Sequence, residues 1–181
     1  MRVQLLICTV LLATNVALAD QAETAETAEI VVEPSQAIVQ VNGIVCSFCA
    51  YGAEKNLSKL EFLDDSQFGG DGVLIDIQSH RITLALRPEQ NLDLARVYKA
   101  ITKGGYDPVS FHVNVQGQVR QDGDRYLLTS TESGQVFEII GDNTERLIGR
   151  GSIRMTGRVD VADVADLKAD QPTPVRISSI D

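Results

Sequence analysis

The residues best suited to chemistry are two cysteines separated by two residues, Cys46 and Cys49, in the stretch Gly43-Ile-Val-Cys-Ser-Phe-Cys49. Cysteine thiolates bind soft metal ions and also carry out thiol–disulfide exchange. A disulfide that closes so short a loop would constrain the unfolded chain very little, so structural stapling explains the spacing poorly. The spacing therefore indicates metal binding or redox chemistry.

The cysteine pair lies where a strand is expected to pass into a helix. Residues 37–41 have strand-like composition and end at the turn signal Asn42-Gly43, and residues 49–60 carry apolar side chains at helical spacing. Because a helix N-terminus favours negative charge, the thiolate form of the pair is favoured there. Two thiolates in one turn can span a linear or bent S–metal–S unit, and soft ligands select Cu(I) and similar ions. A structural zinc site usually has four protein ligands, so we expect an exchangeable ion held by Cys46 and Cys49.

The elements that must position this pair follow from the hydrophobic pattern. Two strands, a second helix and a fourth strand are expected over residues 73–77, 81–86, 92–103 and 108–115. The order strand, helix, strand, strand, helix, strand is the ferredoxin-like βαββαβ arrangement. In that arrangement His80 and Tyr106 fall at the same end as the cysteines. The Asp- and Gly-rich connection 61–72 falls at the opposite end.

Residues 116–181 have a different pattern. Short runs of strand-like composition alternate with glycines; these runs are 125–129, 135–140, 151–159 and 174–180. Several short strands at regular spacing are typical of a small barrel. The stretch Gly151–Val159 loosely resembles bacterial oligonucleotide/oligosaccharide-binding (OB) folds. The expected fold class is therefore α+β, with a ferredoxin-like domain over 36–115 and a small all-β, OB-like barrel domain over 116–181.

The region 37–115 resembles the heavy-metal-associated (HMA) domain of copper chaperones, of metal-pumping ATPase N-termini and of the periplasmic mercury-binding protein. The matching residues are Gly43–Cys49, against that family's Gly-Met-x-Cys-x-x-Cys, and Gly105-Tyr106 before the fourth strand. Ile44 replaces the usual Met, and Val45 replaces a common Thr or His. The resemblance implies that Cys46 and Cys49 are the metal ligands and that Tyr106 stands beside them. It implies Cu(I) as the ion, with Hg(II) or Zn(II) as alternatives, and a metal-donor or metal-acceptor protein as partner.

The N-terminus has the layout of a secretory signal peptide over residues 1–19. Arg2 precedes a mostly apolar run over 3–12, and Ala17-Leu-Ala19 is a small-residue cleavage site. The acidic Ala-Glu-Thr repeat within 20–35 indicates a low-complexity tether. We therefore expect export to the periplasm or cell envelope. The apolar run is short for a spanning helix, so no stable membrane insertion is expected after cleavage.

Charge and missing motifs argue against two classes of function. The net charge of −9, from 16 Lys and Arg against 25 Asp and Glu, disfavours a nucleic-acid partner. Phosphate-binding, zinc-protease and serine-hydrolase motifs are missing from the sequence, so no enzyme is expected and no catalytic or cofactor residue is assigned.

Two hypotheses about function remain open. The first is an exported protein that carries or sequesters a soft metal ion, with His80 either a third ligand or a solvated neighbour. The second is an adaptor in which Cys46 and Cys49 form a disulfide and the barrel-like tail recruits a partner protein. The redox state of the two cysteines discriminates between them.

Overall fold

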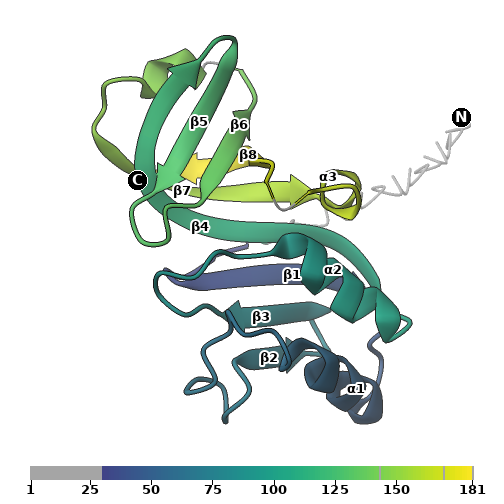
Figure 1. Cartoon of the computed structure of the whole chain (residues 1–181). Helices are drawn as coiled ribbons and strands as arrows, with labels where there is room; N and C mark the ends of the chain where they lie inside the picture. Colours follow the sequence, from purple (N-terminus) through teal and green to yellow (C-terminus); the bar gives the residue numbers. More distant parts are fainter. Residues whose placement is uncertain (1–29, 143, 169, 181) are drawn as a thin grey trace, which may run out of the picture.

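A computed structural model describes residues 30–142, 144–168 and 170–180. The elements are β1 (Gln36–Asn42), α1 (Ser47–Leu57), β2 (Val73–Asp76), β3 (Arg81–Ala85), α2 (Leu94–Lys103), β4 (Asp107–Asp122), β5 (Arg125–Ser130), β6 (Val136–Ile140), the 3₁₀-helix η1 (Thr144–Leu147), β7 (Ser152–Asp160), α3 (Val161–Ala165) and β8 (Thr173–Ile180). The strands join in one sheet with the order β2-β3-β1-β4-β5-β6-β8-β7, and β4 also pairs with β7. Figure 1 shows β4 as one long strand that runs from the lower part of the molecule into the upper part.

The lower part positions the cysteine pair. Strand β1 lies between β3 and β4 and pairs with both in antiparallel register. The alternate side chains Ala37, Val39 and Val41 of β1 are buried in the main core, as period-two patterning requires for a strand with one covered face. Helices α1 and α2 contribute their own buried side chains to that core; these are Ala53, Leu57, Leu94, Val97 and Ile101.

The upper part is a closed barrel of five strands. Its order is β4-β5-β6-β8-β7, and the pairing of β7 with β4 closes the ring. Strands β6 and β8 pair in parallel, whereas the other neighbours are antiparallel. The interior is filled by apolar side chains that include Leu128, Phe137, Met155 and Val175. Burial of such side chains is the main source of folding free energy for a unit of this size.

The expected fold class is wrong. Instead of a ferredoxin-like βαββαβ domain followed by an OB-like barrel domain, the described chain is mostly strands, with three short α-helices and one sheet that closes into a five-stranded barrel. The fourth strand, which the sequence predicts to end at Val115, continues as β4 to Asp122 and passes through the expected boundary between 115 and 116. Within β4, Gly117 is a point of close approach between strands, because a Cβ at this position would collide with the backbone carbonyl of Thr129.

The N-terminal expectations fall only partly on described residues. The expected signal peptide, 1–19, and most of the expected tether lie outside the described residues. Of the tether, residues 30–35 are described, and Val32 is buried at 3% exposure while its carbonyl accepts a hydrogen bond from Asn114 Nδ2 at 2.8 Å. This part of the expected tether therefore packs on β4. None of the helices in the described part of the chain has the length and apolarity to cross a membrane.

Candidate metal-binding site

Cys46 is the N-cap of α1. Its backbone is extended, with φ −152° and ψ 160°, and its Sγ accepts a hydrogen bond from the backbone N–H of Cys49 at 3.2 Å. Its carbonyl accepts the N–H of Ala50 at 3.0 Å, which begins the helical hydrogen bonding. A sulfur thus occupies the place usually taken by a Ser or Asp oxygen. The helix starts at the first cysteine and carries the second one in its first turn.

The two sulfurs form one accessible pair. Both cysteines are free thiols that lie near each other but not at disulfide distance. Cys46 is exposed, whereas Cys49 is half-buried and packs against the main core. An incoming ion or thiol can therefore reach Cys46 directly, whereas Cys49 is only partly accessible.

Hydrogen bonds favour the thiolate form of Cys46. The hydrogen bond with the Cys49 thiol lowers the pKa of Cys46 the most. The backbone N–H groups of Cys49 and Phe48 lower it further. Hydrogen bonds that reach only the charged form of a group stabilise that form. Since the thiolate is the metal ligand and the nucleophile, Cys46 is prepared for either role.

Tyr106 packs against the cysteine turn and is hydrogen-bonded to it. Its hydroxyl donates to the carbonyl of Cys49 at 2.8 Å. Its ring fits beside two glycines, because a Cβ at Gly104 would come within 2.6 Å of the ring and a Cβ at Gly52 within 3.3 Å of the hydroxyl. Burial, and then the nearby cysteines, raise the pKa of Tyr106, so the hydroxyl keeps its proton and remains a donor. Ile44, at 1% exposure, fills the core below the same loop.

His80 lies at this end of the sheet but is not gathered with the cysteines. It occupies the β2–β3 turn with φ +54°, and its carbonyl accepts the N–H of Val41 at 2.9 Å. Its side chain is exposed. Among the described residues, no group of three or more His, Cys, Asp or Glu side chains is placed to hold a metal ion. The ligand set offered by the described chain is therefore the two sulfurs.

Exposed apolar side chains surround the pair, and sequence reasoning missed them. Val45 is 72% exposed, Phe48 90% and Tyr51 57%. The Lys55 ammonium lies 5.5 Å from the centre of the Tyr51 ring. We call Val45, Phe48 and Tyr51 the apolar rim. The sequence did contain a signal for it, because Phe48 stands between the two cysteines of the expected metal-binding turn.

No family model, curated protein or solved structure matches this chain. The resemblance to heavy-metal-associated domains therefore stays a prediction from the residues of the cysteine loop.

Proposed function

We propose that the protein binds a soft metal ion, with Cu(I) the first candidate, through Cys46 and Cys49, in order to carry or sequester it. One observation carries the proposal: the sulfur of Cys46 caps α1 and accepts the N–H of Cys49 in an exposed turn. This arrangement favours a thiolate at the surface and holds a second sulfur beside it. Soft thiolate ligands select Cu(I) over hard cations.

A two-sulfur site suits transfer better than permanent storage. With only Cys46 and Cys49 as ligands from the described residues, an incoming thiol or thioether can join the ion in a three-coordinate state. The ion then leaves with the incoming ligand or stays with the cysteines, according to their relative affinities. Such an incoming ligand would come from a metal-donor or metal-acceptor protein. Tyr106 holds the Cys49 backbone in place through its hydroxyl during the exchange.

The proposal includes action outside the cytoplasm. It is supported by the signal-like composition of residues 1–19, which lie outside the described residues. The mass of the protein recovered from the cell envelope tests this part. A mass lacking residues 1–19 supports export, and an intact N-terminus on protein confined to the cytoplasm contradicts it.

The test of metal binding is a Cu(I) titration of the reduced protein against a competing chelator. All samples carry Cys8→Ser, so that Cys46 and Cys49 are the only thiols among the three cysteines of the chain. We expect tight one-to-one binding that is lost in Cys46→Ser/Cys49→Ser. The His80→Ala variant is the matched control, and its affinity should be unchanged because the His80 side chain is exposed and outside any ligand group.

The result also separates the ions and the alternative function. Tight binding of Hg(II) or Zn²⁺, with Cu(I) bound weakly, would support the two-cysteine site but show that the protein carries another ion. Failure of all three ions to bind in a cysteine-dependent way would contradict the proposal. A disulfide that resists reduction would then favour the adaptor hypothesis.

A further inference from the structure

A second feature of the molecule lies far from the cysteines, where the lower sheet meets the barrel. A cleft with a cavity volume of about 50 Å³ opens between the start of β1, the segment that links β3 to α2, the middle of β4, the β5–β6 turn and β7. We call it the junction cleft. One buried water needs roughly 10–15 Å³ measured in this way, so the junction cleft has room for a compact molecule at its open mouth.

The walls of the junction cleft are fixed. The side-chain amide of Gln135, in the β5–β6 turn, accepts the N–H of Leu92 at 2.8 Å and donates to the carbonyl of Leu92 at 2.9 Å. The N–H of Thr131 donates to the carbonyl of Gln116 at 2.9 Å, which holds the same turn on β4. The cleft is therefore preformed, and a ligand would not have to order it first.

The floor of the junction cleft is apolar. Leu86, Val115 and Phe137 line it, and the last two are buried in the main core. Apolar contact area with a few polar groups at the edge is the usual composition of a small-molecule site. A ligand for this cleft needs an apolar part of small size.

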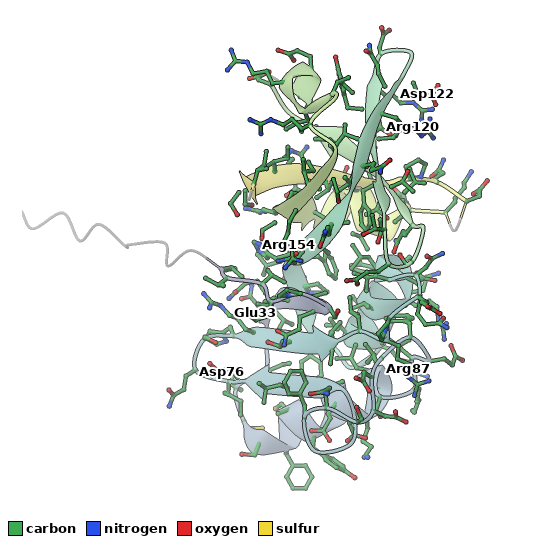
Figure 2. The ribbon with its side chains drawn as sticks, turned by 90° about the vertical axis from the view of Figure 1, so that its left-hand side faces the viewer. Glu33, Asp76, Arg87, Arg120, Asp122 and Arg154 are labelled. Atoms are coloured by element: carbon green, nitrogen blue, oxygen red, sulfur yellow. The ribbon has the colours of Figure 1, made fainter. Side chains whose placement is uncertain are left out.

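Arg154 and Glu132 carry opposite charges at the edge of the cleft, and neither has a charged partner among the described residues. Arg154 of β7 donates to Gln116 Oε1 at 2.6 Å, which is a neutral acceptor and leaves other guanidinium N–H groups free for a ligand. In the described part of the chain, no salt bridge involves Arg154 or Glu132. Figure 2 places Arg154 at the junction of the barrel and the lower sheet.

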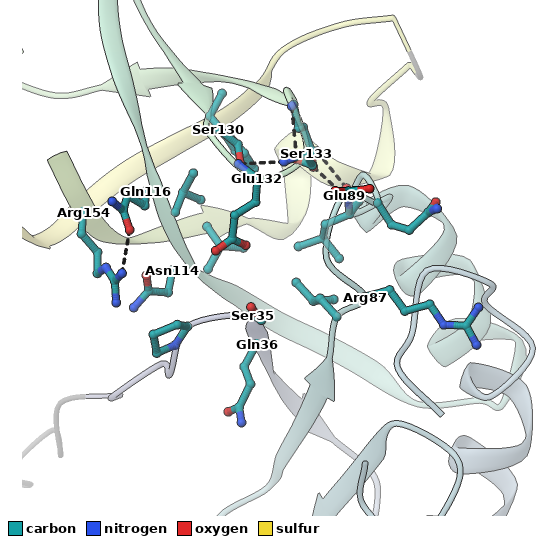
Figure 3. Close-up of a pocket in the computed structure, with 18 residues that line it drawn as sticks. Ser35, Gln36, Arg87, Glu89, Asn114, Gln116, Ser130, Glu132, Ser133 and Arg154 are labelled. Carbon is teal, nitrogen blue, oxygen red and sulfur yellow. Dashed lines mark hydrogen bonds between the residues drawn. The ribbon is translucent and has the colours of Figure 1, made fainter. Parts of the chain in front are cut away.

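The two charges approach the cleft from different elements. Figure 3 shows Arg154 entering from β7 on one side, while Glu132 points into the cleft from the β5–β6 turn. Two further charged groups are labelled near them. Arg87 is already paired with Asp65 at 2.8 Å, and Glu89 lines the cleft from the segment that links β3 to α2. An anion drawn to Arg154 would meet the carboxylate of Glu132, and a cation drawn to Glu132 would meet the guanidinium of Arg154. A molecule that carries both a negative and a positive charge can pair with Arg154 and with Glu132 at the same time.

We propose that the junction cleft binds a free amino acid with a small apolar side chain. Its carboxylate faces the Arg154 guanidinium, its ammonium faces the Glu132 carboxylate, and its side chain lies on Leu86, Val115 and Phe137. Arginine forms bidentate hydrogen bonds with carboxylates, which adds orientation to the attraction. This site is independent of the cysteine pair and of any metal ion.

The test uses L-valine and two analogues that each lack one charge. The analogues are 3-methylbutanoate, which lacks the ammonium, and 2-methylpropylamine, which lacks the carboxylate. Binding to the full chain is followed by calorimetry and by the amide NMR signals of β4. We expect saturable one-to-one binding of valine, with each analogue at least tenfold weaker.

Variants assign the two charges. Arg154→Gln should lower the affinity for valine at least tenfold, so that valine binds no more tightly than 2-methylpropylamine. In Glu132→Gln, valine should bind no more tightly than 3-methylbutanoate. Arg150→Gln and Glu145→Gln are exposed controls outside the cleft and should bind valine as the unchanged protein does. Cys46→Ser/Cys49→Ser should also bind valine normally, so failure of the metal proposal leaves this one standing.

Three results would overturn the proposal. The first is the lack of saturable binding of valine up to its solubility limit. The second is binding that both cleft variants leave unchanged, while thermal unfolding shows each variant to be folded. Equal affinity for valine and for either analogue would also contradict it, because one of the two charges would then have no role.

Discussion

At the scale of single residues, the chemistry of the site depends on the hydrogen bonds that reach the Cys46 sulfur. Cys46 replaces the oxygen of an ordinary N-cap and gains the hydrogen bonds that such an oxygen would accept. Its neighbours Val45 and Phe48 are exposed and apolar, so they contribute no competing ligand. The reactivity of the site is therefore set by the hydrogen bonds between the two cysteines and by the first turn of α1.

The first prediction concerns the partner of Cys46. Because the Cys49 thiol makes the largest contribution to lowering the pKa of Cys46, Cys49→Ala should raise that pKa and slow alkylation of Cys46 at pH 7. Cys49→Ser retains a side-chain donor and should keep much of the fast rate. The pH dependence of iodoacetamide alkylation, in the Cys8→Ser background, measures both. Equal rates in all three proteins would show that the backbone N–H groups alone set the thiolate population.

The second prediction concerns His112, which is half-buried on β4 with its Nε2 3.0 Å from Ser110 Oγ. Burial first, and then the positive charges of Arg158 and Arg81, lower the pKa of His112 to about 4. An unfolded chain binds this proton near pH 6.5. The unfolded state therefore binds more protons between about pH 6.5 and 4, and the free energy of unfolding falls as the pH is lowered through that window.

We expect the loss to be about 1 to 2 kcal/mol, after allowance for the solvent that reaches a half-buried imidazole. Urea unfolding at pH 7 and pH 4 measures it. His112→Gln should lose less stability than the unchanged protein over the same interval, because glutamine does not titrate. If both proteins lose the same amount, carboxylates and not His112 cause the acid sensitivity.

At the scale of elements, the hydrophobic periodicity and the turn residues of the sequence predicted most strands and helices to within a few residues. The second helix, expected over 92–103, is Leu94–Lys103, and the run expected at 135–140 is Val136–Ile140. These segments have strong patterns and clear stop signals, so local sequence is sufficient for them. The cysteine turn was also predictable, because Cys46, Cys49 and the turn signal before them are adjacent in the chain.

The pairing of elements was not predictable in the same way. Closure of the barrel depends on β4 meeting β7, whose residues lie far away in the sequence. A glycine in a strand can mark an end or a close approach, and local sequence does not distinguish the two. The junction cleft was missed for a similar reason, because Glu132 and Arg154 come from different elements and have no motif in common.

The third prediction tests the close approach at Gly117. A Cβ at this position would collide with the backbone carbonyl of Thr129, which cannot move without breaking the β4–β5 ladder. Gly117→Ala should therefore lower the free energy of unfolding by about 2 to 3 kcal/mol. Gln118→Ala is the control, because Gln118 is exposed on the same strand and its loss should cost less than about 0.5 kcal/mol. Similar values for both variants would show that β4 can shift to accept the methyl group.

At the scale of the whole molecule, strand pairing, side-chain hydrogen bonds and a shared core join the lower sheet to the barrel. Strand β4 pairs with β1 over its first half and with β5 over its second half, while β7 spans the region between. The Gln135 side chain adds two hydrogen bonds to the backbone of Leu92, which is almost fully buried. One hydrophobic core extends from Val39 in the lower sheet to Val175 in the barrel. These connections predict that both parts unfold together.

The fourth prediction is therefore a single cooperative transition. In urea, the amide NMR signals of β3 and of β6 should lose intensity with the same midpoint, because neither part keeps its core when β4 leaves the sheet. Gln135→Ala removes both bonds to Leu92 and leaves buried backbone groups without partners, so stability should fall by about 1 to 3 kcal/mol. Both sets of signals should move to the same lower midpoint, whereas Gln118→Ala should move neither. Separate midpoints for β3 and β6 would show that the barrel and the cysteine-bearing sheet are independent units, and the junction cleft would then have no fixed walls.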